Sequence, residues 1–378
     1  MKQPTILVTG ATGKTGGAVV EQLVAKGFPV RAVIRSRDAR SERLDRLGVE
    51  TVFADPFDPD QLLAAMRGTQ RAYYLPVFDP YMIQGSAAFA VAAREAKLES
   101  IVQMGQWLSH RSHPAIMTRQ TWLTDRLLSQ IPGVAHTILN PGMFADNFLR
   151  VMDLAVLLGI FPVLTGEGRA APVSSEDMAR VAAALLIAPT GHEGKTYRPT
   201  GPALLSGKEM AAEVAKVIGR RVMAVNLPFW MFRKVARQQR INPLEISGFR
   251  FYVEEMKRGT FELNGGVTDV VRELTGAPAE SFGTTIARYA AMPFAKPTFF
   301  NKLKAFLNFN LTPFYWGYNL EKWDREKGFP VPPAASLSID DSQWCSEHGA
   351  SMEEAAATAS RPKSSPGDAA LQPDAASS

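Results

Sequence analysis

A glycine-rich loop near the amino terminus restricts the fold of this chain more than any other feature. The loop follows a short apolar run, residues 5–8, and its sequence is Gly10-Ala11-Thr12-Gly13-Lys14-Thr15-Gly16. Apolar residues then recur at helical spacing over residues 19–24, and Gly27 stands where a helix commonly ends. A second apolar run follows at residues 30–34. The order of strand, glycine loop, helix and strand predicts a βαβ unit.

Short apolar runs continue to alternate with amphipathic stretches as far as about residue 140. The six runs expected as strands are residues 5–8, 30–34, 51–54, 72–75, 101–104 and 136–139. This alternation is typical of parallel strands joined by crossover helices, because each helix covers one face of the sheet. We therefore expect an α/β protein with a doubly wound, Rossmann-like parallel sheet.

The alternation loosens beyond Gly142, and this change divides the expected domains. Residues 1–145 are predicted to form the Rossmann-like domain, and residues 146–295 a smaller C-terminal α/β domain on the substrate side, with some segments returning to the sheet. That domain is expected to contain helices at residues 146–158, 178–187, 208–218 and 245–256, and strand-like pieces at residues 195–198 and 221–225. Residues 296–330 form an aromatic and basic extension. Residues 331–378 are rich in Ala, Ser, Pro and acidic residues, which predicts a disordered tail.

The glycine loop has the features of a phosphate-binding turn. A diphosphate needs backbone amide hydrogens directed at it without an intervening Cβ, and a helix amino terminus adds partial positive charge. Gly10 and Gly13 would provide the tight turn and the close approach, and Gly16 would let the helix lie against the strand. The alternative is a strand-to-helix turn that is glycine-rich for packing reasons alone. A Walker A loop is excluded, because Val8 stands where that motif requires another glycine.

The end of the second expected strand indicates which dinucleotide the loop would accept. An NAD site places an acidic residue there against the ribose 2′-hydroxyl, whereas a 2′-phosphate calls for arginine. Arg35 occupies this position and can bind phosphate through two hydrogen bonds. NADP(H) is therefore favoured over NAD(H), although a solvent-facing arginine at a strand end is the alternative. Asp55, after the third strand, is either an acceptor for the adenine amino group or a turn-capping residue.

Composition and charge exclude several classes of protein. The single cysteine, Cys345, rules out an intramolecular disulfide, and the amino terminus shows no export signal, so we expect a cytoplasmic protein. No apolar stretch is long enough to cross a bilayer. The net charge of +5 conceals a basic body, because residues 331–378 contain seven acidic and two basic residues. The basic residues are scattered, so no nucleic-acid partner is expected. No regular Cys/His spacing indicates a metal site.

The chain resembles the NmrA-like branch of the atypical short-chain dehydrogenase/reductase family, which includes NADPH-dependent quinone oxidoreductases. The resemblance spans roughly residues 4 to 290. It rests on residues 8–16, on residues 33–35, on the stretch Asn140-Pro141-Gly142-Met143-Phe144 and on residues 192–197. The resemblance implies that Pro141, Gly142 and Phe144 contact the nicotinamide end of the cofactor. The other cofactor-binding residues expected at strand ends and on the helix after the fifth strand are Leu75, Pro76, Met104, Gly105 and Arg119.

The departures from ordinary short-chain dehydrogenases concern catalysis. Those enzymes use a serine after the fifth strand and a Tyr-x-x-x-Lys pair, in which lysine lowers the pKa of the tyrosine. Here Gly105 or a neighbour replaces the serine. Arg119 occupies the position expected for the lysine, and Ala115 the position expected for the tyrosine. Arginine cannot deliver a proton at neutral pH. The substitutes considered as proton donors are His110, His113 and Tyr81, each of which is better explained as a surface or packing residue, and no catalytic residue is assigned.

Two functions from different classes follow from these features. The first is an NADPH-dependent reductase of a small carbonyl or quinone-type acceptor, since hydride transfer requires only that nicotinamide and acceptor be held face to face. The second is a non-catalytic NADP(H)-binding regulator that reports redox state to a protein partner. A homodimer is compatible with either. The basic aromatic segments 229–237 and 299–323 are interpreted either as packing elements or as sites of peripheral membrane contact.

Overall fold

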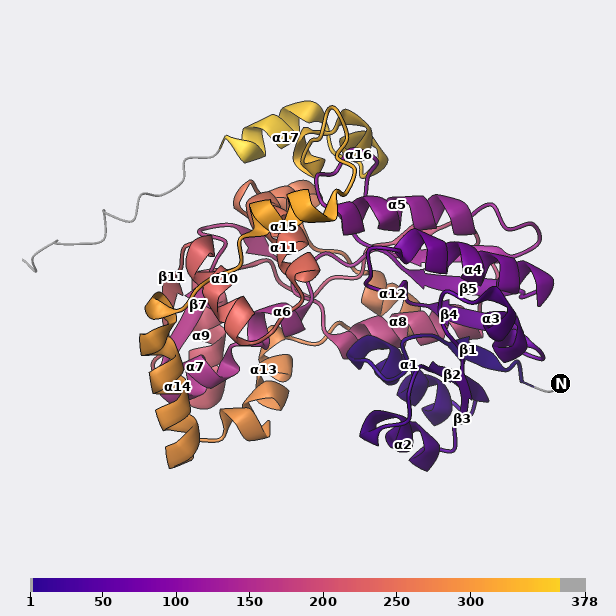
Figure 1. Ribbon diagram of the computed structural model, residues 1–378, viewed down its shortest axis with the longest axis horizontal. Helices are drawn as coiled ribbons and strands as arrows, with labels where there is room; N and C mark the ends of the chain where they lie inside the picture. The colour runs from indigo at the N-terminus through magenta and orange to yellow at the C-terminus, as the bar shows by residue number, and fades with distance from the viewer. Residues whose placement is uncertain (1–2, 361–378) are drawn as a thin grey trace, which may run out of the picture.

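The computed structural model describes residues 3–360, and its centre is a seven-stranded parallel β-sheet (Figure 1). The strands run in the order β3-β2-β1-β4-β5-β6-β9 across the sheet. Their bounds are β1 (Ile6–Val8), β2 (Val30–Ile34), β3 (Glu50–Phe53), β4 (Arg71–Tyr74), β5 (Ser100–Met104), β6 (Ala135–Leu139) and β9 (Thr196–Tyr197). The prediction of a doubly wound parallel sheet is confirmed. The strand-like piece expected at residues 195–198 joins this sheet as its edge strand β9.

Helices cover both faces of the sheet, because successive side chains of each strand point to opposite faces. In β1, Ile6 and Val8 pack against one set of helices, whereas Leu7 packs against the other. The first set is α1 (Lys14–Ala25), α8 (Ser175–Ile187) and α12 (Val270–Thr275). The second set is α3 (Pro59–Met66), α4 (Met82–Glu95) and α5 (Ile116–Leu128). The short helix α2 (Ala39–Arg46) connects β2 to β3.

A smaller α/β part lies beyond the carboxyl ends of the strands, on the left of Figure 1. Its strands are β7 (Ile160–Val163), β8 (Arg169–Ala170), β10 (Leu205–Ser206) and β11 (Met223–Asn226), and they pair as β7 with β11 and β8 with β10. Its helices are α6 (Ala145–Leu149), α7 (Met152–Leu158), α9 (Gly207–Ile218), α10 (Phe229–Gln238), α11 (Pro243–Lys257), η1 (Thr260–Gly265), α13 (Phe282–Ala290) and η2 (Pro293–Ala295). This part has an apolar core of its own.

The single helix expected at residues 146–158 is wrong, because the chain forms two helices there. The break falls at Arg150 and Val151, between α6 and α7. Leu149 and Met152, on either side of the break, are both fully buried in the core of the smaller part. These two buried side chains anchor the end of α6 and the start of α7 in the same core.

The prediction of a disordered tail over residues 331–378 is wrong for residues 331–360. After α14 (Phe299–Leu311), η3 (Thr312–Phe314) and α15 (Leu320–Lys327), the chain forms η4 (Ser338–Asp340), α16 (Ser342–Glu347) and α17 (Met352–Ala359). Ile339, Trp344 and Cys345 are each 1% exposed and pack in a cluster that includes Trp107 and Phe261. A few large apolar residues thus anchor a segment whose average composition is polar. Residues 361–378 lie outside the described residues.

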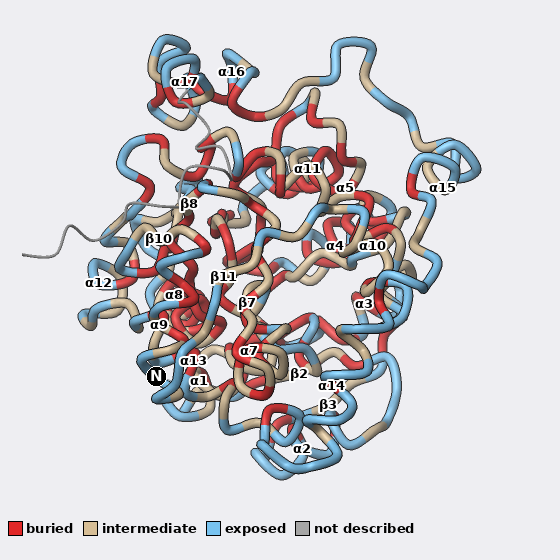
Figure 2. Tube along the Cα trace, turned by 90° about the vertical axis from the view of Figure 1, so that its left-hand side faces the viewer, coloured by how far each residue is buried: buried red, intermediate tan, exposed pale blue. Residues whose placement is uncertain are grey.

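Figure 2 shows where these segments lie relative to the buried core. The buried parts of the trace run through the sheet and the helices next to it, and the segment from α15 to α17 passes over the outside. This segment is held by hydrogen bonds as well as by its apolar anchors. The amide of Ser336 donates to the carbonyl oxygen of Ser112 at 3.0 Å. The hydroxyl of Ser338 donates to the carbonyl oxygen of Leu108 at 3.1 Å. The carboxyl-terminal segment therefore covers the loop that follows β5.

Candidate cofactor site

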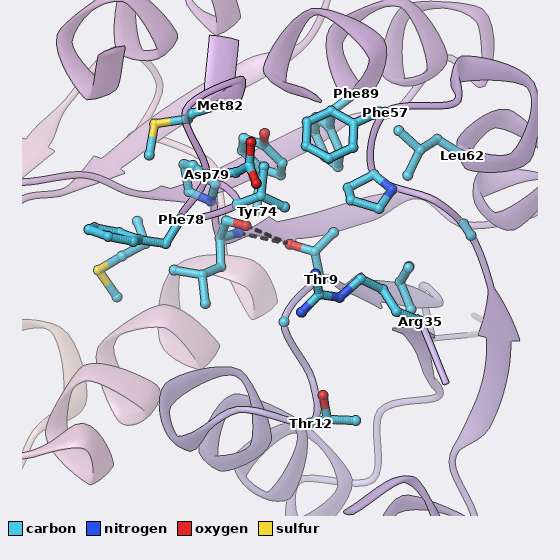
Figure 3. Close-up of a pocket in the computed structure, with 18 of the residues that line it drawn as sticks. Thr9, Thr12, Arg35, Phe57, Leu62, Tyr74, Phe78, Asp79, Met82 and Phe89 are labelled. Carbon is cyan, nitrogen blue, oxygen red and sulfur yellow. Dashed lines mark hydrogen bonds between the residues drawn. The ribbon is translucent and has the colours of Figure 1, made fainter. Parts of the chain in front are cut away.

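A cavity of about 630 Å³ opens at the carboxyl ends of β1, β2, β4 and β5 (Figure 3). Open α/β sheets bind ligands where the strand order reverses, and here the reversal lies between β1 and β4. Gly10 follows β1 and Leu75 follows β4, and both residues line the cavity. The other expected site residues that line it are Thr12, Arg35, Pro76, Met104 and Gly105. The structure thus brings seven of the expected residues together in one cavity.

The glycines of the loop are required by close contacts. Gly10 has a φ of +64°, and a Cβ there would lie 2.7 Å from Leu75 Cδ2. A Cβ on Gly16 would lie 2.3 Å from the carbonyl oxygen of Gly10, so only glycine lets α1 start so close to β1. Gly13 is the N-cap of α1 and has no side chain to cap it. The free amide hydrogens of the first helical turn therefore remain available to an anion, as a bound diphosphate requires.

The rest of the loop holds the two parts of the molecule together. Ala11 is buried in the core between the sheet and α1, and Lys14 and Thr15 begin the first turn of the helix. Lys14 Nζ contacts Asp146 Oδ1 at 3.2 Å and the hydroxyl of Tyr289 at 2.5 Å. Asp146 lies on α6 and Tyr289 on α13. The amino terminus of α1 is therefore linked to the smaller part directly beside the phosphate-binding turn.

Two arginines give one end of the cavity its positive charge. Arg35 follows β2, and Arg40 lies in the first turn of α2; both line the cavity together with Ser36. Arg40 NH2 donates to Asp38 Oδ2 at 2.6 Å, and this contact lowers the pKa of Asp38 to about 2. Arg37, between them in sequence, instead pairs with Asp45 and lies over Phe53. The sequence analysis did not select Arg40, although its position at the start of the segment that follows Arg35 is a signal that could have done so.

Asp55 does not line the cavity, although its neighbours Ala54, Pro56 and Phe57 do. Its Oδ1 accepts the amide hydrogen of Phe57 at 2.9 Å, which is the geometry of a turn-capping aspartate. The aromatic ring of Phe57, shown in Figure 3, lies on the cavity side of the turn. A contact between the Asp55 carboxylate and adenine stays a prediction.

A side chain at the position after β5 would collide with the side chain of Asn140. A Cβ on Gly105 would lie 2.1 Å from Asn140 Oδ1 and 3.0 Å from Ile138 Cγ2. The Oδ1 atom of Asn140 is buried and has no hydrogen-bond partner among the described residues. A serine here, where ordinary short-chain dehydrogenases place one, would therefore require the side chain of Asn140 to move.

Gln106, the next residue, brings a polar group to the same end of the cavity. Gln106 is among the residues that line the cavity, and its Oε1 accepts a hydrogen bond from the hydroxyl of Tyr252 at 2.8 Å. Tyr252 lies on α11, and burial raises the pKa of its phenol, so this hydroxyl stays protonated and acts as the donor. The bond fixes the carboxamide of Gln106 with its oxygen toward Tyr252. Sequence reasoning missed this pair because 146 positions separate the two residues.

Four further expected cofactor-binding residues, Arg119, Pro141, Gly142 and Phe144, also lie outside this cavity. The guanidinium of Arg119 donates to the carbonyl oxygens of His113, Pro114 and Pro330, and the side chain lines a second cavity of about 390 Å³. The carbonyl oxygen of Pro141 accepts the amide hydrogen of Trp107 at 3.3 Å. Gly142 packs beside the ring of Phe261, and Phe144 forms a β-bridge with Val173. Their contacts with the nicotinamide end stay predictions.

The three residues considered as proton donors do not line the cavity either. Burial lowers the pKa of His110 to about 4 and lowers that of His113 well below its usual value, so both imidazoles are neutral at pH 7. They face Asp341 and Glu255, two carboxylates that also hold the carboxyl-terminal segment. Tyr81 is 66% exposed. Within residues 3–360, no group of His, Cys, Asp and Glu side chains is arranged to hold a metal ion.

The parallel sheet, the glycine turn at the strand-order reversal and the arginines after β2 define a protein with a Rossmann-type dinucleotide-binding fold. Comparison with known families is more specific. The chain belongs to the NmrA-like family, whose model matches residues 2–277.

Relatives with named activities share most of the matched region. An NAD(P)H azoreductase from Xenophilus azovorans is 29% identical over 304 residues, which cover 76% of this chain and 98% of the relative. The NADPH-dependent quinone oxidoreductase of Escherichia coli, solved in complex with NADPH, superposes with a TM-score of 0.63 at 24% identity over 75% of this chain and 99% of that chain. A negative transcriptional regulator, NmrA, solved in complex with NAD, superposes with a TM-score of 0.60 at 17% identity over 76% of this chain and 95% of that one.

Proposed function

We propose that this protein is an NADPH-dependent reductase that transfers a hydride to a small carbonyl or quinone-type acceptor. The observation that carries the proposal is that the glycine turn, Arg35 and Arg40 line one continuous cavity, which ends at Gly105 and Gln106. The names of the azoreductase and the quinone oxidoreductase among its relatives support the same class of reaction.

The chain's own residues fit a phosphorylated dinucleotide from end to end. The amide hydrogens at the start of α1 would bind the diphosphate, and Arg35 with Arg40 would bind the 2′-phosphate through charged hydrogen bonds. Phe57 and Pro56 would enclose the adenine end. Leu75, Met104 and Gly105 would then border the nicotinamide end. Bound NADPH supplies the hydride.

Gln106 is the residue that we assign to the acceptor. With its oxygen held by Tyr252, its amide nitrogen is the group left to donate a hydrogen bond to an acceptor carbonyl. Such a donor stabilises the negative charge that develops on the carbonyl oxygen as hydride arrives. The proton can come from water, because a quinone acceptor needs no strong general acid. Tyr252 is a positioning residue in this scheme.

The test is NADPH oxidation by purified protein with a panel of quinones and small carbonyl compounds. We expect turnover with at least one quinone, and the Gln106→Leu variant should lower kcat by about 10²-fold while NADPH affinity stays unchanged. Tyr252→Phe should lower kcat less, because the amide remains. Tight NADPH binding without turnover of any acceptor would reject the reductase.

The second function is a regulator that binds NADP(H) without catalysis, and the placement of the residues considered as proton donors outside the cavity favours it. The two functions differ in what NADPH does to the protein. A regulator would bind NADPH and NADP⁺ with clearly different affinities and show no turnover, whereas the reductase would consume NADPH in the presence of an acceptor. Calorimetry with both nucleotides, followed by the acceptor panel, separates these outcomes.

A further inference from the structure

One face of α14 carries large apolar side chains that nothing in the described structure covers. The helix lies at the left edge of the molecule in Figure 1, on the side away from the seven-stranded sheet. Ala305 is 2% exposed and faces the body, where α14 packs against α7. The apolar side chains left exposed on α14 are Phe299, Phe300, Leu303, Phe306, Leu307 and Leu311. We call these six residues the α14 face.

The exposure is strongest at the two ends of this region. Phe299 and Phe300, at the start of α14, are 73% and 79% exposed, and Phe314 and Trp316, just beyond its end, are 82% and 84% exposed. Isolated exposed apolar residues are common on protein surfaces, but a contiguous group of this kind marks an interaction site. The family model ends at residue 277, so the α14 face belongs to the extension beyond it.

The charged residues in the stretch of sequence that contains the α14 face all have one sign. Residues 281–320 contain no aspartate or glutamate, and their basic residues are Arg288, Lys296, Lys302 and Lys304. Within residues 3–360, neither Lys302 nor Lys304 forms an ion pair. The charge of Lys304 interacts with the carboxylate of Asp153 on α7 only at longer range. Two lysines therefore stand beside exposed aromatic rings with their charges available to an anionic partner.

A second copy of this chain fits the α14 face poorly. Pairing two α14 helices would bring four ammonium groups together, and no carboxylate of residues 281–320 could neutralise them. An anionic lipid surface supplies the missing negative charge and accepts Phe, Leu and Trp side chains at its interface at the same time. Among the described residues, no helix is long and apolar enough to cross a membrane. A helix that lies in the membrane surface carries Phe and Leu on one face with lysines beside it, and α14 has this composition.

We propose that the α14 face, together with Phe314 and Trp316, docks this protein on an anionic lipid surface. The aromatic and leucine side chains enter the boundary between headgroups and acyl chains, and Lys302 and Lys304 bind the headgroup phosphates. The proposal is independent of the reductase activity, since none of these residues lines the cofactor cavity.

The test is co-sedimentation of the full-length protein with vesicles of phosphatidylcholine alone and of phosphatidylcholine mixed with phosphatidylglycerol. We expect binding to the mixed vesicles that weakens as salt is raised, because screening acts on the lysine contacts. The variant Phe300→Ser/Trp316→Ser should lower the partition coefficient by about tenfold or more, since it removes two aromatic side chains from the lipid boundary. Lys302→Glu/Lys304→Glu should lower it to a similar extent on mixed vesicles only.

The matched control is Val91→Ser/Leu123→Ser, which removes two apolar side chains that are 48% and 45% exposed on α4 and α5. It should bind vesicles like the wild type. All three variants change exposed residues, and thermal unfolding verifies that each one is folded. Quenching of Trp316 by brominated lipid gives a second readout, with Trp316→Phe as its blank.

Three outcomes overturn the proposal. The first is that the wild type binds neither kind of vesicle. The second is that the Phe300→Ser/Trp316→Ser variant binds as well as the control variant, which would mean that another surface is responsible. Alternatively, light scattering shows a dimer that Phe300→Ser/Trp316→Ser dissociates and that vesicles do not affect, in which case the α14 face joins two copies of the chain.

Discussion

The indole Nε1 of Trp344 donates a hydrogen bond to the carbonyl oxygen of Trp107 at 3.0 Å, although 237 positions separate the two residues. Their rings also meet edge to face, with centroids 5.5 Å apart. Trp107 directly follows Gln106, which lines the cofactor cavity. The carboxyl-terminal segment thus holds the loop after β5 from outside, and its packing supports a wall of the site.

The first prediction concerns this anchor. Trp344→Ala should lower the free energy of unfolding by about 3–5 kcal/mol, because it leaves a cavity where a fully buried indole packs. Urea unfolding followed by circular dichroism measures the change. The matched control is Trp316→Ala, which removes an indole that is 84% exposed and should leave stability unchanged. Equal stability of both variants would contradict the anchoring role.

The second prediction concerns selection of the phosphorylated cofactor. Arg35→Ala and Arg40→Ala should each weaken NADPH binding by about tenfold or more, because each removes a charged hydrogen bond to the 2′-phosphate. NADH binding should change little. Arg37→Ala is the matched control, since Arg37 pairs with Asp45 and does not line the cavity. Titration calorimetry decides the matter, and an equal loss for both nucleotides would rule out the assigned role.

The third prediction tests the glycine turn. Gly16→Ala places a methyl group 2.3 Å from the carbonyl oxygen of Gly10, so the turn must move. We expect NADPH and NADH affinities to fall together and stability to drop by about 1–3 kcal/mol. Gly283→Ala on α13, where the added methyl group would lie 3.6 Å from Ser281 Oγ, should be neutral or slightly stabilising. Unchanged binding of both nucleotides by Gly16→Ala would show that the turn does not hold the diphosphate.

The fourth prediction concerns Asp125, a buried residue of α5. Burial raises the pKa of Asp125 to about 7, although hydrogen bonds from Gln103 and Ser109 and the charge of Arg126 act in the opposite direction. Between pH 4 and pH 7 the folded state therefore binds more protons at this site than the unfolded state, and this site's contribution to stability falls as pH rises.

The Asp125→Asn variant removes that dependence while keeping an oxygen to accept from Gln103. The stability of the variant relative to the wild type should therefore increase from about pH 4 to about pH 7 and then stay constant. Denaturant unfolding at a series of pH values measures this difference. A difference that does not vary with pH would show that Asp125 is ionised in the folded protein throughout this range.

The sequence predicted the sheet well because each strand is a short apolar run between polar turns. Residues 30–34 match β2 at both ends, and the other five expected strands agree to within one residue. Two elements were wrong for a physical reason that composition cannot reveal. The break between α6 and α7 and the order of residues 338–359 both depend on single buried side chains, such as Leu149 and Trp344, finding partners far away in the sequence.

The cofactor site was predictable where it depends on backbone geometry and less so where it depends on distant packing. The glycine turn and Arg35 occupy fixed positions after β1 and β2, so their spacing alone placed them at the cavity. Arg119 lies in the predicted helix, but its guanidinium donates a hydrogen bond to the carbonyl oxygen of Pro330, a residue of the extension. Tyr252 reaches Gln106 from α11. No local pattern in the sequence records either contact.

Because α8 and β9 return to the main sheet after the smaller part, the amino-terminal half of the chain cannot be expressed alone without exposing part of its core. Since α8 packs along α1 and β9 closes the sheet edge, a fragment that stops before residue 175 would expose Val19, Val20 and Leu23 to water. Such a fragment is expected to aggregate. Limited proteolysis between α7 and α8, in contrast, should leave the two pieces associated and soluble, because the interface between them is part of the main core.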